Sequence, residues 1–279
     1  MNLLLLVLAL QKPESLSVRF AGMTAITGYE QAVTDSLLVL LPGSTRDRTG
    51  NVTLTLGRGS PKRLVYCNLD EVGYVVGNIT EDGYVLLRRV GGGARLDPLF
   101  DQQIEGQRVT LFGRRGAVPG VVAVRSTHLT RGRPSRDELP FTIDNAYVDV
   151  GAASRDDVLA LGISGLTPMS QTKRPYRYGD RAGLLAAPNA GRRAACAALA
   201  SAALSRPRVS GTVVVAFMVQ SLYADTAGLK TVQNLQGPFR ESRQVSVPAR
   251  FPDTSVETVG LREVNALMAD IVKWIGGGQ

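Results

Sequence analysis

The sequence predicts an α/β body with a small β domain inserted into it. Helix-like and strand-like segments alternate up to Glu71 and again after about position 172. Between these positions the chain changes to short strands separated by turn residues, which is typical of a small barrel or sandwich. We therefore expect one domain formed by residues 1–71 and 172–279, and an inserted domain formed by residues 72–171.

The first part of the body is predicted to hold two helices and two strands. Residues 14–41 have helical character, with a break at 24–30 and apolar residues at helical spacing after it. Pro42-Gly43 ends the second helix. Strands are expected at 51–56 and 63–68, separated by a turn that contains glycine and proline.

The inserted segment is predicted to be a set of short strands. They are expected at 72–79, 84–90, 108–112, 116–124 and 146–150. Asp82-Gly83 and Arg115-Gly116 supply tight turns between them. Ser154, with Asp157 three residues later, predicts a short capped helix that ends at Leu161.

The second part of the body supplies two helices and a buried strand. Residues 191–204 form an alanine-rich helix, and residues 212–220 contain an apolar run expected of a fully buried strand. Residues 261–275 place their apolar side chains on one side of a helix. The two cysteines, Cys67 and Cys196, fit small core positions, and the sequence leaves open whether they pair.

The charge of the chain indicates a basic surface without a specific nucleic-acid site. The net charge is +8, from 32 Lys and Arg against 24 Asp and Glu. The arginines are scattered, and an aromatic content of 6% provides no stacking platform for bases. A basic surface that binds acidic polymers is therefore the weakest of our functional hypotheses.

The first residues are apolar, but the run is too short to span a bilayer. Its length suits either the apolar part of an export signal or a helix packed on the body. We expect an exported protein if Met1–Gln11 is a signal segment and a cytoplasmic one otherwise. No transmembrane segment is predicted.

Several short motifs resemble one known family. Leu64–Gly73 reads Leu-Val-Tyr-Cys-Asn-Leu-Asp-Glu-Val-Gly, followed by Asp82-Gly83-Tyr84 and Val90-Gly91-Gly92. Together with Gly116–Val121 and Asp149–Ser154, these motifs resemble the glutamyl-aminopeptidase and deblocking-aminopeptidase family of zinc exopeptidases, also called endoglucanase-like. The resemblance implies a zinc-exopeptidase-like body, with a central mixed sheet flanked by helices, around the inserted β domain.

The resemblance also implies a pair of zinc ions, and this sequence departs from the family at the ligand positions. Zinc is held by histidine nitrogen and carboxylate oxygen, but Asn68 stands where the family has a histidine. Gly191 stands near the bridging carboxylate, Leu222 at a glutamate and Asp253 near another histidine. Ser221 stands at the position of the general base, where the family has a glutamate. The segment between Gly228 and Pro248 is shorter than the resemblance implies.

Two further residues bear on this comparison. Asp70 is retained, and the family assigns it to orienting a ligand rather than to binding metal. The only histidine of the chain is His128, which we interpret as a hydrogen-bonded structural residue. We therefore predict a relative that has lost its zinc ligands and catalytic glutamate, without a cofactor, that serves in assembly or peptide binding.

An alternative is an active metal-dependent aminopeptidase with a rebuilt site. It would use zinc and would need Asp70, Ser221 and Asp253 close together. The resemblance further implies a homo-oligomer formed through the inserted β domain, because the family forms dimers and large assemblies that often use this domain.

Overall fold

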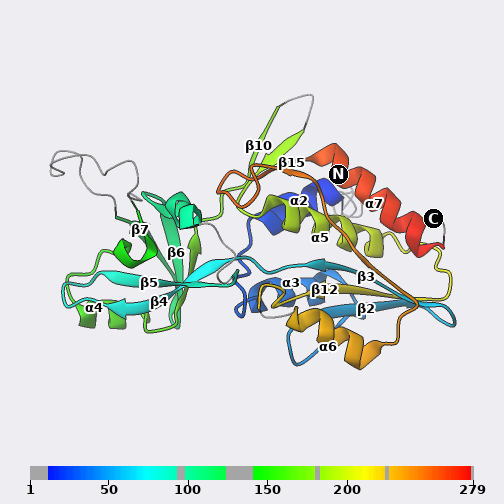
Figure 1. Cartoon of the computed structure of the whole chain (residues 1–279), viewed down its shortest axis with the longest axis horizontal. Helices are drawn as coiled ribbons and strands as arrows, with labels where there is room; N and C mark the ends of the chain where they lie inside the picture. The colour runs from blue at the N-terminus through cyan, green and yellow to red at the C-terminus, as the bar shows by residue number, and fades with distance from the viewer. Residues whose placement is uncertain (1–11, 93–97, 124–140, 180–182, 224–225, 278–279) are drawn as a thin grey trace, which may run out of the picture. The chain divides into compact units, whose positions relative to one another are not determined.

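The structure is a computed structural model that describes residues 12–92, 98–123, 141–179, 183–223 and 226–277. The chain divides into two compact units, which we call the body, Met1–Glu71 with Lys173–Gln279, and the barrel unit, Val72–Thr172. Figure 1 shows both units. The expected domain boundary after the insertion differs from this division by one residue.

The body contains a mixed five-stranded sheet. Its strands, in spatial order, are β1 (Thr45–Arg46), β2 (Val52–Gly57), β12 (Thr212–Met218), β3 (Lys62–Asn68) and β13 (Glu241–Gln244). β12 lies in the middle, antiparallel to β2 and parallel to β3, and β13 is parallel to β3. The β-branched run of β12 suits a strand buried on both faces, and its residues 213–218 are all buried.

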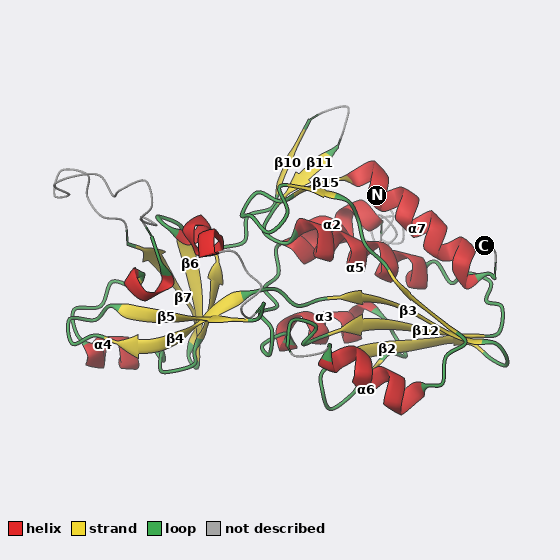
Figure 2. Cartoon of the chain, viewed as in Figure 1, coloured by secondary structure: helices red, strands yellow, loops and turns green. Residues whose placement is uncertain are grey.

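In the described part of the body, the helices that surround this sheet are α2 (Pro13–Ala21), α3 (Gln31–Leu40), α5 (Ala190–Leu204), α6 (Ala227–Gln236) and α7 (Leu261–Ile275), of which α2 and α7 pack against α5. Side chains alternate between the two faces of a strand. Accordingly, Val213, Val215 and Phe217 join the large core with α2, α3, α5 and α7. Val214, Ala216 and Met218 form a smaller cluster with Val232 of α6 on the other face. Figure 2 shows α5 and α6 on opposite sides of the sheet.

The alanine-rich α5 lies at the centre of the body. It contacts α2, α7 and β3, and nearly all of its residues are buried. Small side chains let these elements approach α5 closely. The expected helices at 191–204 and 261–275 are therefore confirmed, the second with the same bounds.

A second, four-stranded antiparallel sheet completes the body. Its order is β10 (Tyr176–Tyr178), β11 (Leu184–Ala186), β15 (Thr258–Gly260) and β14 (Ala249–Arg250). β15 leads directly into α7. The sequence did not predict this sheet as a unit, since its strands have only two or three residues each.

The barrel unit is a closed barrel, which decides between the barrel and the sandwich that the sequence allowed. Its strands are β4 (Gly73–Ile79), β5 (Val85–Val90), β8 (Tyr147–Asp149), β7 (Gly116–Val122), β6 (Arg108–Gly113) and β9 (Pro168–Gln171). Outside the barrel strands lie α4 (Arg155–Ala160) and 3-10 helices at Pro98–Ile104 and Ile143–Asn145. The Ser154 side chain accepts a hydrogen bond from the Asp157 N–H, so the predicted cap of α4 is confirmed.

Among the described residues, no helix has the length and apolar character needed to span a bilayer. The segment Met1–Gln11, on which the export expectation rests, lies outside the described residues, and so does His128.

Candidate functional site

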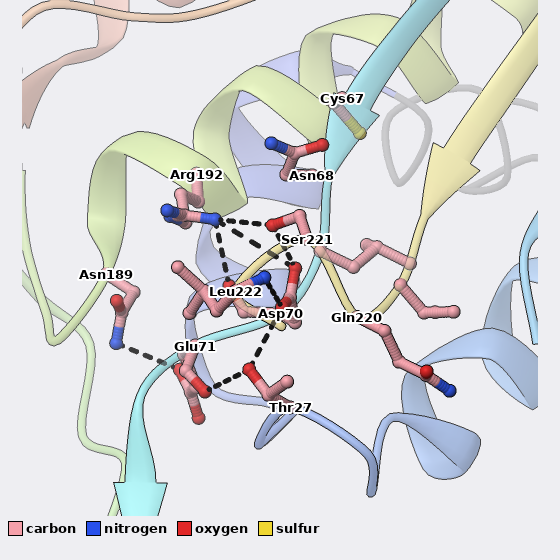
Figure 3. Close-up of polar contacts among 12 residues, drawn as sticks. Thr27, Cys67, Asn68, Asp70, Glu71, Asn189, Arg192, Gln220, Ser221 and Leu222 are labelled. Atoms are coloured by element: carbon pink, nitrogen blue, oxygen red, sulfur yellow. Dashed lines mark hydrogen bonds and ion pairs between the residues drawn. The ribbon is translucent and has the colours of Figure 1, made fainter. Parts of the chain in front are cut away.

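The candidate site lies where two parallel strands of the body end. In the register of β3 and β12, Cys67 is opposite Phe217 and Asn68 is opposite Met218. The segments that follow these strands therefore leave the same edge of the sheet. The first turn of α5 lies beside them, and Figure 3 shows Arg192 of α5 reaching toward Asp70 and Ser221.

Asp70 is the centre of a buried hydrogen-bond network. Its side chain is fully buried, and its Oδ2 accepts hydrogen bonds from Thr27 Oγ1 and from the Leu222 N–H, each at 2.9 Å. Its Oδ1 accepts a hydrogen bond from the Ser221 hydroxyl. The carboxylate thus ties together the segment before α3, the end of β3 and the end of β12 (Figure 3).

Arg192 supplies the positive charge next to this carboxylate. Its Nη1 donates hydrogen bonds to Ser221 Oγ at 3.1 Å and to the backbone carbonyl of Asp70 at 3.3 Å. The same nitrogen lies 3.9 Å from Asp70 Oδ1. Sequence reasoning missed this role. The available signal was a pair of arginines in the first turn of a helix, where the helix dipole disfavours cations.

A second buried network fixes the start of α5. Glu71 Oε2 accepts hydrogen bonds from Lys173 Nζ at 2.8 Å, from Arg193 Nη2 at 2.9 Å and from Asn189 Nδ2 at 3.0 Å. Burial alone would raise the pKa of Glu71, but Lys173 and Arg193 outweigh it and hold the pKa below its ordinary value. The network holds α5 against the loop that carries Asp70.

A pocket of about 320 Å³ lies beside these networks, and its lining includes Asn68, Gly191, Arg192, Asp253 and Glu257. Glu257 is nearly buried. Its Oε1 accepts from the Gly191 N–H at 2.6 Å, and its Oε2 accepts from the Asp253 N–H at 3.1 Å. Burial raises the pKa of Glu257, and these two hydrogen bonds oppose that rise.

The structure divides the predicted site residues into two adjacent groups. Asp70, Ser221 and Leu222 belong to the buried network, whereas Asn68, Gly191 and Asp253 line the pocket. Arg192 belongs to both groups.

The two cysteines lie directly behind the site. Cys67 precedes Asn68 on β3 and forms a disulfide with Cys196 of α5. Both residues are fully buried, as expected of small core residues. The disulfide attaches the end of β3 to the helix that carries Arg192 and Arg193.

More than half of the chain matches one protein family. A model of the M42 glutamyl aminopeptidases matches residues 50–221, which is more than half of the sequence and includes the end of β3, the start of α5 and β12. The chain belongs to the M42 glutamyl aminopeptidase family. The resemblance that the sequence motifs suggested is therefore confirmed.

Curated relatives of this M42 chain include aminopeptidases. It is 34% identical over 158 residues to the putative aminopeptidase SgcX of Escherichia coli, a match that covers 54% of this chain and 40% of that protein. It is 29% identical over 142 residues to a lysyl aminopeptidase of Pyrococcus furiosus, covering 49% of this chain and 39% of that protein. The M42 chain spans about two fifths of the length of the curated relatives it matches.

Solved structures share the fold of this M42 chain. An aminopeptidase of Desulfurococcus kamchatkensis superimposes with a TM-score of 0.76 at 16% identity, covering 96% of this chain and 95% of the other. The TET1 peptidase of Pyrococcus horikoshii, described as assembling into a tetrahedron or a large octahedral shell, gives 0.72 at 18% identity, covering 92% and 97%. The predicted fold class is thus confirmed.

Proposed function

We propose that this M42 chain is a non-catalytic member of its family that binds short peptides in the pocket beside Arg192. The observation that carries this proposal is the position of the Arg192 guanidinium, which donates hydrogen bonds to the Asp70 carbonyl and to Ser221 Oγ. These residues follow the strand ends where the resemblance implies a pair of zinc ions. A fixed cation at this point repels a divalent metal ion and favours an anionic group of a ligand.

The side chains at the pocket do not fit a zinc pair. Zinc prefers histidine, thiolate and carboxylate ligands, but Asn68 offers only a neutral amide, and Cys67 is held in a disulfide. Both oxygens of Glu257 already accept backbone hydrogen bonds. Within the described part of the chain, no three His, Cys, Asp or Glu side chains are grouped so that they could bind a metal ion.

The packing at Gly191 is fitted to a residue without a side chain. A Cβ added to Gly191 would lie 2.8 Å from Glu257 Oε1. An aspartate at this position would therefore displace the Glu257 carboxylate, which accepts a hydrogen bond from the backbone N–H of residue 191. The local packing of the pocket supports a site without the bridging carboxylate.

The position of the general base supports the same proposal. A hydroxyl group does not take a proton from water at neutral pH as a carboxylate does, and Ser221 is already hydrogen-bonded to Asp70 and Arg192. Both carboxylate oxygens of Asp70 are engaged as well. A hydrolase site rebuilt on Asp70, Ser221 and Asp253 therefore has less support than a binding site.

Metal content and catalysis test this proposal together. We expect the purified chain to hold far less than one zinc ion per chain by elemental analysis, even after incubation with zinc. We expect no cleavage of aminoacyl p-nitroanilides, and binding of dipeptides by calorimetry. About two zinc ions per chain together with cleavage would refute the proposal.

We further propose that the chain forms a homo-oligomer through the barrel unit. The name of the Pyrococcus horikoshii relative, which describes large assemblies, supports self-association. The barrel unit presents exposed apolar side chains on neighbouring strands, including Val121 of β7 and Tyr147 of β8, and their burial against a second copy would be favourable.

Light scattering tests this assembly. Val121→Glu is expected to lower the mass of the assembly, whereas Val39→Glu, at an exposed position of α3 in the body, is the matched control and is expected to leave it unchanged. A monomeric wild-type protein, or equal masses for both variants and wild type, would contradict the proposal.

A further inference from the structure

We infer that the pocket recognises the free carboxylate of an amino acid or dipeptide, with Arg192 as the anion-binding residue. The inference rests on the proposed peptide-binding function and adds the end of the ligand that is recognised. Four observations, on Arg192, on the neighbouring donors, on the nearby acids and on the size of the pocket, lead to it.

Arg192 is held by one nitrogen and leaves its other donors for a ligand. Its Nη1 makes both hydrogen bonds to the protein, to Ser221 and to the Asp70 carbonyl. Its Nη2 and Nε make no hydrogen bond to another described residue. The side chain is 37% exposed, and it lines the pocket. An arginine that is already fixed loses little freedom when it binds a carboxylate through two parallel hydrogen bonds.

Other donors line the same pocket. The side chains of Asn68 and Ser246 both border it, and neither makes a hydrogen bond to another described residue. An asparagine amide donates up to two hydrogen bonds and a serine hydroxyl donates one. Together with Arg192, these side chains can donate the hydrogen bonds that replace those a carboxylate loses when it leaves water.

The nearby acids select a carboxylate that belongs to a zwitterion. Asp253 and Glu257 also line the pocket, and buried Asp70 lies 3.9 Å from Arg192 Nη1 and reduces the positive potential there. A doubly charged anion such as phosphate would be repelled by these three carboxylates. A ligand with a carboxylate at one end and an ammonium group at the other can place its ammonium group near Asp253 and Glu257.

The size of the pocket suits a ligand of one or two residues. A volume of about 320 Å³ is at the small end of ligand pockets. We therefore expect free amino acids and dipeptides to bind, with the α-carboxylate at Arg192.

Calorimetry on the full-length chain tests the inference with three probes: alanyl-alanine, alanyl-alanine amide and inorganic phosphate. The amide lacks only the negative charge of the carboxylate. We expect the dipeptide to bind at least tenfold more tightly than its amide, and phosphate not to compete. Equal binding of the acid and the amide, or equal binding of phosphate, would overturn the inference and leave the proposed peptide-binding function standing.

Variants identify the residue responsible. Arg192→Gln is expected to weaken binding of the dipeptide at least tenfold and to remove its preference over the amide. Arg262→Gln, with the same charge change at an exposed position of α7 outside the pocket, is the control and should bind like wild type.

A thermal melt of each variant separates loss of folding from loss of binding. If Arg192→Gln does not fold, Asn68→Ala tests the inference in its place, because it leaves Arg192 unchanged. It is expected to weaken binding of alanyl-alanine several-fold more than binding of its amide. An equal effect of Asn68→Ala on both ligands would overturn the inference. Zinc-dependent cleavage of the dipeptide would instead overturn the proposed function.

Discussion

Replacing Glu71 by glutamine should destabilise the body by roughly 3–5 kcal/mol, the cost of removing one partner from a buried ion pair. The Glu71 side chain is only 1% exposed, and its Oε2 accepts from both Lys173 and Arg193. The glutamine would leave two buried cations without a counter-charge. Arg193 would keep its hydrogen bond to the Leu69 carbonyl, whereas no other hydrogen bond is made by the Lys173 ammonium to the described residues.

The loss should depend on pH in a defined direction. The pKa of Glu71 is lowered in the folded protein, because Lys173 and Arg193 outweigh the effect of burial. Its stabilising contribution is therefore complete above its unfolded pKa, near pH 4.3, and is lost as the pH falls through the folded value. The difference between wild type and Glu71→Gln should be full at pH 7 and should shrink below about pH 4.

The single tryptophan makes the measurement specific to the body. Trp274 lies on α7, where it is nearly buried and its Nε1 donates to Glu241 at 3.0 Å, so its fluorescence reports unfolding of the body. Glu71→Gln should lower the guanidinium midpoint by about 1 M.

The control for this measurement is Asp270→Asn, which removes a half-exposed ion pair with Arg243 in the same unit. It should cost less than about 1 kcal/mol. Equal midpoints for the two variants, or a loss for Glu71→Gln that does not change down to pH 3, would refute the reasoning.

Two further predictions concern the body. Replacing Cys67 and Cys196 by alanine should lower its stability by about 2–5 kcal/mol, since the disulfide closes a loop of 129 residues; free thiols in the denatured, unreduced wild-type protein would argue against the pairing. Gly57→Ala should cost more than Gly59→Ala in the same denaturation assay. Both glycines have a positive φ, which costs alanine about 1–2 kcal/mol, but only at Gly57 would a Cβ also meet the Gly211 carbonyl, at 2.4 Å, for a further 1–3 kcal/mol or so. Equal losses for the two glycine variants would show that steric overlap is not the cause.

The elements that the sequence predicted well are those whose local pattern is strong. Leu261–Ile275 alternates apolar and polar residues at helical spacing, so both of its ends were predictable. The run of β-branched residues in β12 likewise marked a buried strand. In these segments the residues that form the core are close together in sequence.

The elements that the sequence missed depend on distant partners. α6 (Ala227–Gln236) buries Val232 but few other apolar side chains, so its sequence holds few apolar residues that would mark a helix. β9 has only four residues, and it closes the barrel by pairing with both β4 and β6. Neither pairing can be read from a segment of four residues.

The candidate site shows the same limit. The sequence motifs marked Asn68, Asp70 and Ser221 as neighbours in function, but not how they are connected. The hydrogen bond between Ser221 and Asp70 joins residues 151 positions apart, and the role of Arg192 follows only from the way α5 packs beside β3. The charge that the pocket presents to a ligand is therefore a property of the tertiary structure.

The ion pair between Glu71 and Lys173 joins the last body residue before the barrel unit to the first body residue after it. The chain therefore leaves the body and returns to it at two residues that are held together by an ion pair. Because its two ends lie together, the inserted segment can be lengthened, replaced by another domain or shortened to a linker without a change in the strand order of the body. Related proteins with this architecture can therefore differ in their inserted domain while the pocket beside Arg192 stays intact.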